Sequence, residues 1–121
     1  MANHVLVVLS NVKGGADAAF NEWYTNIHLG DILAVDGFSA AQRFKLSDSQ
    51  VGDATSPYAY LALYEIDTDD LSGPIAALQA AGQGAMEISD ALDIENTVAW
   101  LYTPVTERVT QEETAAARAG A

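Results

Sequence analysis

Cysteine and positive charge are the two scarcities that first limit what this chain can be. The 121 residues contain no cysteine, which excludes disulfides, thiolate nucleophiles and cysteine-based zinc or iron–sulfur sites. Positive charge is scarce, because five Lys+Arg stand against 17 Asp+Glu and give a formal net charge of −12. A field of that sign repels phosphate backbones and anionic membrane surfaces. We therefore expect neither nucleic acid nor a membrane as a partner.

Long apolar runs and a basic leader are also missing. No apolar run approaches the roughly 20 residues that span a bilayer, and residues 1–4 lack the basic start of a secretory signal. We therefore expect a cytoplasmic protein. Half of the residues are hydrophobic and 18% are charged, a composition typical of a globular chain with a real core. We place a single domain at residues 1–105. Residues 106–121 are a C-terminal tail that is either frayed or packed on a partner.

The apolar pattern predicts an alternation of strands and helices. Short β-branched or alternating runs predict strands at residues 5–9, 38–46, 58–66 and 96–102. In the second of these, the alternation predicts that Phe38 shares a side with Gln42 while Arg43 lies on the other side. Helical spacing predicts one helix from residue 16 to about 26, able to continue to 33, and another over residues 67–82.

The first predicted helix carries one continuous apolar stripe. Its members fall at positions i, i+3, i+4, i+7 and i+8, which lie on one face of a helix. They are Phe20, Trp23, Tyr24, Ile27 and His28. The stripe predicts that this face packs against the sheet.

The order β-α-β-β-α-β matches the α+β, ferredoxin-like arrangement, a four-stranded antiparallel sheet with helices on one face. The third strand is apolar on both sides, with Leu61 and Leu63 opposite Tyr60 and Tyr64. A bare sheet face of that kind exceeds what a monomer normally exposes. We therefore expect a two-fold homodimer whose second sheet covers it.

Four segments carry a family resemblance. FNEWYTNIHL at residues 20–29 resembles the helix motif of EthD-like proteins in the dimeric α/β barrel superfamily. LAVDGF at 33–38 and AAQRF at 40–44 look like that family's helix exit and second strand, and YLALYEI at 60–66 resembles its third strand. The resemblance covers about residues 4–105 and implies a dimeric α/β barrel. One departure is Asp36, where relatives often carry proline, and it concerns the stiffness of the loop.

The resemblance implies an activity only broadly. The superfamily includes cofactor-free isomerases, polyketide cyclases, lyases, haem-degrading monooxygenases and proteins with no assigned activity, and a fold does not settle function. It also implies that the histidine at position 28 is the functional residue. The residues themselves must therefore indicate the chemistry.

His28 is the leading catalytic candidate, because an imidazole can exchange a proton near neutral pH without a metal. The alternative is a buried histidine bonded to a backbone carbonyl or to Asp31. Asp31, three residues further on, can orient the imidazole and raise its basicity, or it is simply an exposed carboxylate. Tyr24, one turn earlier, can donate to a developing oxyanion, or it is a core residue with its hydroxyl at the surface.

A second group of side chains is predicted to bind the substrate in a pocket for a flat, apolar molecule. The prediction for the strand aromatics assumes that their faces look toward the helices. Aromatic residues at strand spacing also serve as core or dimer interface. Arg43 can meet a carboxylate or phenolate, or form a structural ion pair, and Asn11 can be a turn residue. The predicted group is Asn11, Trp23, Arg43, Tyr60, Tyr64 and Trp100.

No metal or cofactor is expected. His4 and His28 have no regular ligand spacing, and the sequence has no nucleotide-binding glycine motif and no serine nucleophile elbow. Our hypothesis is a small cofactor-independent enzyme of the isomerase, cyclase or lyase type. In it His28 transfers a proton on an aromatic or polyketide-like small molecule. The alternatives are a non-catalytic small-molecule-binding dimer and a haem or oxygen-using monooxygenase with His28 as axial ligand.

Overall fold

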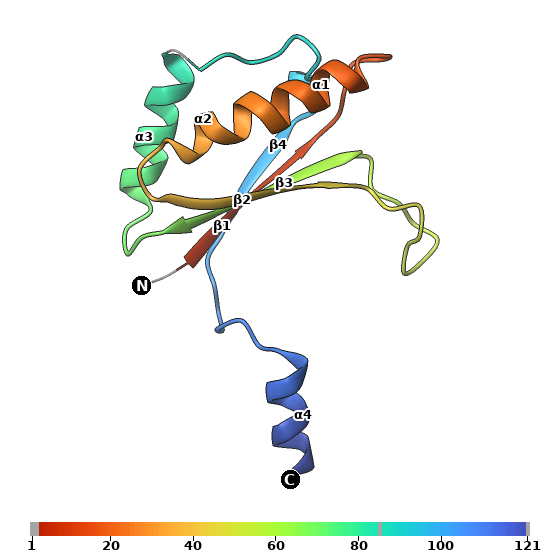
Figure 1. Ribbon diagram of the computed structural model, residues 1–121, viewed down its shortest axis with the longest axis vertical. Helices are drawn as coiled ribbons and strands as arrows, with labels where there is room; N and C mark the ends of the chain where they lie inside the picture. The colour runs from red at the N-terminus through yellow and green to blue at the C-terminus, as the bar shows by residue number, and fades with distance from the viewer. Residues whose placement is uncertain (1–2, 85, 121) are drawn as a thin grey trace.

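The computed structural model describes residues 3–84 and 86–120 of the chain. It consists of one four-stranded antiparallel sheet in the order β2-β3-β1-β4, with helices on one of its faces (Figure 1). The predicted α+β, ferredoxin-like order is confirmed. The elements are β1 (Asn3–Ser10), α1 (Asp17–Trp23), the π-helical η1 (Tyr24–His28), α2 (Leu29–Leu33), β2 (Phe38–Lys45), β3 (Tyr60–Asp67), α3 (Ser72–Gln83), the 3-10 turn η2 (Ile94–Asn96), β4 (Val98–Tyr102) and α4 (Gln111–Ala119).

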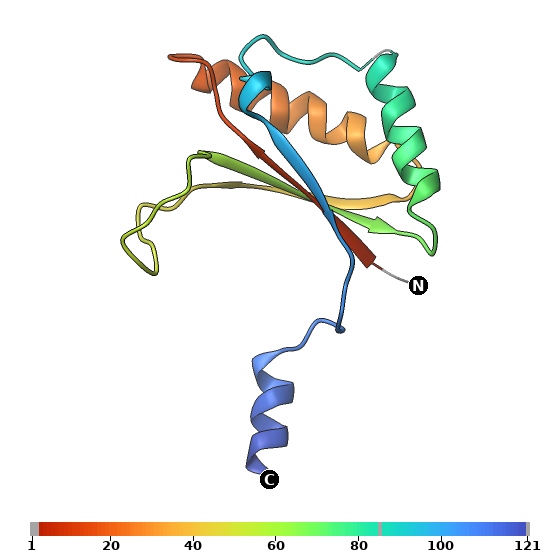
Figure 2. The same ribbon diagram turned by 180° about the vertical axis from the view of Figure 1, so that it is seen from behind.

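The two faces of the sheet differ in what covers them. Alternate residues of the strands face the helices and form the core, and Leu6 lies there opposite Tyr64. None of the described helices covers the other face (Figure 2). Across it runs an apolar row in which Val7 pairs with Leu63 on one side and Trp100 on the other. Trp100 is 58% exposed, so the predicted bare apolar face is present.

The start of β2 differs from the predicted alternation. A register shift between Phe38 and Ala40 places two residues opposite one and resets the alternation of faces. Phe38 is therefore buried opposite Ile66, on the same side as Ala41 and Arg43. The prediction that Phe38 shares a side with Gln42 is wrong, because an alternation count cannot detect an inserted residue.

The first helix runs without a break over α1, η1 and α2, as predicted, but its middle turn is π-helical. A π turn contains one extra residue and therefore rotates all later residues of the helix relative to an α-helical count. Tyr24, His28 and Ile32 consequently face the core, whereas Ile27 is 47% exposed. The prediction that Ile27 belongs to the buried stripe is wrong for this reason.

The tail forms α4, which Figures 1 and 2 show standing away from the sheet. The hydroxyl of Thr110 accepts a hydrogen bond from the backbone N–H of Glu113 at 3.1 Å and so caps the start of α4. Every described residue of α4 is exposed, as is Val105 before it. Packing of this helix on a partner stays a prediction. Among the described helices, none combines the length and apolarity needed to span a bilayer.

Gly37 fixes how the first helix meets β2. It has a φ of +94°, and a β-carbon placed there would lie 2.7 Å from Cγ of Pro74 in α3. We expect Gly37→Ala to lower the free energy of unfolding by about 1–3 kcal/mol, because both the backbone and the contact are strained. The matched control is Gly30→Ala, where nothing lies within 4 Å, and which should be neutral or stabilising by up to roughly 1 kcal/mol. Urea denaturation measures both. Equal stabilities for the two variants would contradict this account.

Candidate functional site

A cluster of aromatic rings joins the first helix to the sheet. The ring of Trp23 stacks on His28, with centroids 4.5 Å apart and 25° between the planes. Tyr24 meets the same imidazole edge-on at 4.9 Å and 86°. His28 lies against both rings and is only 9% exposed. The structure thus places three of the predicted site residues in direct contact.

The imidazole of His28 is held without a hydrogen bond on one nitrogen. Its Nδ1 is buried and has no partner among residues 3–84 and 86–120. Burial lowers the pKa of His28 below its usual value, and the nearby charge of Asp31 raises the pKa by a smaller amount. Asp31 therefore acts as a nearby charge and not as a hydrogen-bond partner of that nitrogen. At neutral pH the ring is uncharged and can accept a proton.

Tyr24 and Tyr64 form a buried hydroxyl pair. The hydroxyl of Tyr64 donates to that of Tyr24 at 3.2 Å, and burial raises the pKa of both phenols. Both hydroxyls stay protonated, and the Tyr24 proton remains available to another acceptor. The alternative in which the Tyr24 hydroxyl lies at the surface is wrong, because the side chain is 3% exposed.

Arg43, on the edge strand β2, lies over the ring of Tyr24. Its guanidinium carbon is 4.6 Å from the centroid of that ring, a cation–π distance. Its nitrogens donate to Oγ1 of Thr25 at 2.9 Å and to Oδ1 of Asn21 at 3.0 Å. Both acceptors are uncharged, and within the described part of the chain no carboxylate contacts the guanidinium. The structural ion pair considered for Arg43 is therefore not observed.

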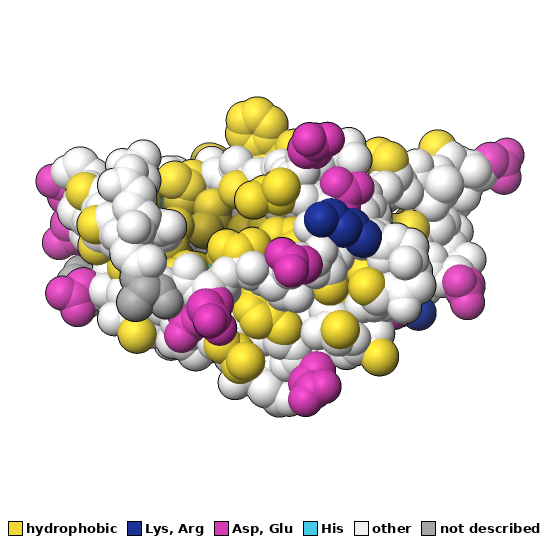
Figure 3. Space-filling view, turned by 90° about the horizontal axis from the view of Figure 1, so that it is seen from above, with side chains coloured by type: hydrophobic (Ala, Val, Ile, Leu, Met, Phe, Trp, Pro, Cys, Tyr) yellow, Lys and Arg dark blue, Asp and Glu magenta, His cyan; other side chains and the backbone are white. Residues whose placement is uncertain are grey.

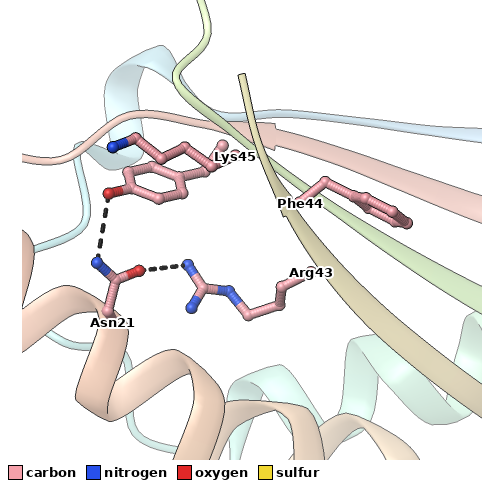
Figure 4. A pocket seen from close by; sticks show the side chains of 5 residues that line it. Asn21, Arg43, Phe44 and Lys45 are labelled. Atoms are coloured by element: carbon pink, nitrogen blue, oxygen red, sulfur yellow. Dashed lines mark hydrogen bonds between the residues drawn. The ribbon is translucent and has the colours of Figure 1, made fainter. Parts of the chain in front are cut away.

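A shallow pocket of about 270 Å³ opens beside this arginine. Figure 4 shows Asn21 facing Arg43 and Lys45 on the same side of β2, while Phe44 points away. Asn21 also donates to the hydroxyl of Tyr60 at 3.3 Å, and Tyr60 donates to Asp17 at 3.1 Å. Asn21 and Lys45 were not predicted as site residues. The period of two along β2, which puts Lys45 beside Arg43, was the signal that could have identified the lysine.

Two of the predicted binding residues lie elsewhere. Asn11 joins two loops, because its Oδ1 accepts from the N–H of Ala59 at 2.9 Å and its Nδ2 donates to the carbonyl of Pro57 at 3.0 Å. These bonds tie Asn11 to the loop that precedes β3. Trp100 lies on the uncovered face opposite Val7. The assumption that it shares a face with Tyr60 and Tyr64 is wrong. The pairing of β4 with β1 places Leu101, and not Trp100, opposite Leu6 on the helix-facing side.

The charged side chains on the surface seen from above are mainly acidic (Figure 3). Seen from above, acidic side chains spread around the molecule and hydrophobic ones gather toward the middle (Figure 3). No group of three or more possible metal ligands occurs within residues 3–84 and 86–120.

Trp23, at the edge of the cluster, donates its indole N–H to the carbonyl of Glu87 at 3.2 Å. The segment after α3 is thereby tied to the cluster.

Comparison with known proteins establishes the fold. No family model and no curated protein matches the sequence. An EthD family protein from Bacillus halodurans superposes with a TM-score of 0.56 at 16% identity, over 84% of this chain and 97% of that one. An EthD-like protein from Ralstonia eutropha gives 0.55 at 16% identity, over 89% and 97%. A dimeric ferredoxin-like protein of unknown function from Thermobifida fusca gives 0.55 at 14%, over 85% and 92%. The resemblance to EthD-like proteins is thus confirmed for the fold.

The buried imidazole makes a prediction about stability. Because the pKa of His28 is lowered in the folded state, the unfolded chain takes up a proton first as the pH falls below 6.5. The free energy of unfolding of the wild type should therefore fall between pH 6.5 and the lowered pKa. The His28→Gln variant should lack this pH-dependent loss of stability. Urea denaturation of both proteins at pH 7.5 and 5.5 measures it, and a difference between them that does not change with pH would refute the burial account.

Proposed function

We propose that this protein is a small enzyme that uses His28 to move a proton on an aromatic or polyketide-like molecule, without a cofactor. The observation that carries the proposal is the buried, unpartnered Nδ1 of His28. A polar atom left without a partner inside a protein costs stability. Such a cost is typical of groups kept free for a ligand or a reaction. A purely structural histidine would be expected to satisfy that nitrogen.

The neighbours of His28 suit one reaction class. The neutral imidazole takes a proton from an activated carbon or hydroxyl of the substrate, and the electron pair moves onto a substrate oxygen. The Tyr24 hydroxyl, itself accepting from Tyr64, donates to that oxygen, and the positive charge of Arg43 across the Tyr24 ring stabilises it. The imidazolium then returns the proton at another atom. The products are those of an isomerase, a cyclase or a lyase.

Access to His28 requires movement, because the side chain is almost completely buried. A cavity of about 370 Å³ is lined by Trp23 and another of about 240 Å³ by Asp31, and His28 lines neither of these two. The hydrogen bond from Trp23 to Glu87 holds the segment after α3 against the indole. Movement of Trp23 together with this segment would uncover the imidazole on which the indole stacks.

The burial of His28 favours one alternative, a non-catalytic binding protein in which His28 is a packed core residue. It does not favour the haem alternative. A haem iron needs open space beyond the ligating nitrogen, whereas this imidazole is enclosed by Trp23 and Tyr24 at 4.5 and 4.9 Å. The residues around His28 therefore do not fit a haem. Proton exchange on a bound ligand separates the two remaining candidates.

Proton transfer can be detected before the product is known. The purified protein is incubated in D₂O with aromatic acids, phenols and polyketide-like lactones, and NMR follows loss of the exchangeable C–H signal. We expect His28→Gln to slow the exchange by about 10²–10⁴-fold, the usual contribution of a general base. The control is His4→Gln, because His4 is buried but bonded to Thr103 at 3.1 Å, away from the cluster. Binding without exchange in wild type and both variants would favour the binding protein instead.

We also propose that the chain is a homodimer formed through the uncovered sheet face, with residues 1–105 as its domain. The apolar row of Val7, Leu63 and Trp100 supports this, as does the dimeric state named for the Thermobifida fusca protein of the same fold. A second sheet would remove this row from water. Residues 106–121 are then free to reach the second subunit.

The dimer prediction is tested by charge at this face. Trp100→Asp should shift the sedimentation coefficient from dimer to monomer, because a carboxylate buried between two apolar sheets is costly. Val51→Asp makes the same kind of change at a fully exposed loop position and should leave the dimer intact. Circular dichroism checks that both variants fold. Identical sedimentation of Trp100→Asp and wild type would overturn the proposed interface.

A further inference from the structure

The pocket beside Arg43 concentrates positive charge in an acidic protein. The chain has five basic residues against 17 acidic ones, yet Arg43 and Lys45 both line this one pocket. Both come from β2 and lie on its helix-facing side, opposite Ala62 and Tyr60 of β3. With so many carboxylates in the chain, an ion-pair partner would be easy to supply. Among the described residues, Arg43 nevertheless bonds only to the uncharged Thr25 and Asn21.

The arginine is held in place rather than left mobile. Three aromatic rings surround its guanidinium carbon, at 5.3 Å for Phe20, 4.6 Å for Tyr24 and 5.4 Å for Tyr60. These rings and the two hydrogen bonds orient the planar guanidinium and reduce the entropy it would lose on binding. An arginine has five N–H donors, and the two that are engaged leave others for a ligand. A planar, oriented guanidinium matches a carboxylate with two parallel hydrogen bonds.

A second pocket adjoins the first and is mostly apolar. It has a volume of about 260 Å³ and shares Phe44, Lys45 and Tyr60 with the charged pocket. Its other walls include Leu9 and Leu61, which lie on the uncovered face of the sheet. This second hollow therefore lies toward the face that the proposed second subunit would cover, whereas Arg43 and Lys45 lie on the helix-facing side. A ligand of the charged pocket would find its apolar contacts in Phe44 and Tyr60, which line that pocket as well.

We propose that the pocket beside Arg43 binds a small carboxylic acid with an apolar body, its carboxylate held by Arg43 and Lys45. Asn21 positions the guanidinium through its Oδ1 and fixes the Tyr60 hydroxyl through its Nδ2. The carboxylate of Asp17 accepts from Tyr60 and does not line the pocket, so it does not occupy the cationic side. The inference does not require His28 to be catalytic. It concerns the pocket beside Arg43, which His28 does not line.

Binding of benzoate to the full chain tests the proposal, by isothermal titration calorimetry with benzyl alcohol as the neutral analogue. Wild type should bind benzoate and not benzyl alcohol, and added salt should weaken the interaction. Arg43→Gln should weaken benzoate binding by about tenfold or more. Lys45→Gln should weaken benzoate binding by about threefold. Because the Lys45 side chain is exposed, this variant tests the site even if the arginine variant fails to fold.

The control removes the same charge elsewhere. Lys13→Gln changes the net charge by the same amount at an exposed loop position and should leave the affinity for benzoate unchanged. Equal affinity in wild type, Lys45→Gln and Arg43→Gln, or equal binding of benzyl alcohol and benzoate, would overturn the proposal. His28→Gln should bind benzoate as the wild type does. If His28→Gln loses isotope exchange but still binds benzoate, the two sites are independent. A failure of the binding proposal can then be told apart from a failure of the proposed catalysis.

Discussion

The packing of Tyr24 between the first helix and the sheet is the interaction on which the rest of the site depends. One side chain, almost completely buried, touches the imidazole of His28, accepts a hydrogen bond from Tyr64 on β3 and lies under the guanidinium of Arg43 on β2. Each contact comes from a different element. The ring therefore fixes the distance between helix and sheet, and with it the relative positions of a neutral base, a phenol and a cation.

The π turn determines which residues take part. In a regular α-helix, Ile27 would share the face of Phe20, Trp23 and Tyr24, because it lies seven residues after Phe20. The extra residue in the turn from Tyr24 to His28 moves Ile27 toward solvent and leaves His28 enclosed by the two aromatic rings. π turns cost hydrogen-bond geometry and are common at functional sites. The turn ends at an imidazole that is buried and has one nitrogen without a described partner, an arrangement that suits reaction better than stability.

The fold and the site differ in how far the sequence predicts them. The strand and helix order can be predicted from hydrophobic spacing, and the bare sheet face from β3 being apolar on both sides. The bulge at Phe38 and the π turn cannot, because each inserts one residue without changing the composition of the segment. The placement of Trp100 failed for a related reason. The alternation along β4 identifies two faces, but only the pairing with β1 decides which of them meets the helices.

The central claim is that His28 is kept neutral and free at the helix–sheet junction. An NMR titration of the imidazole ¹³C–¹H signals tests it most directly, with His28→Gln assigning the resonance and His4 serving as an internal comparison. The account predicts a midpoint for His28 below 6.5, because burial outweighs the charge of Asp31. A midpoint at or above 6.5 would show that the imidazole is solvated or paired with a carboxylate, and would contradict the account.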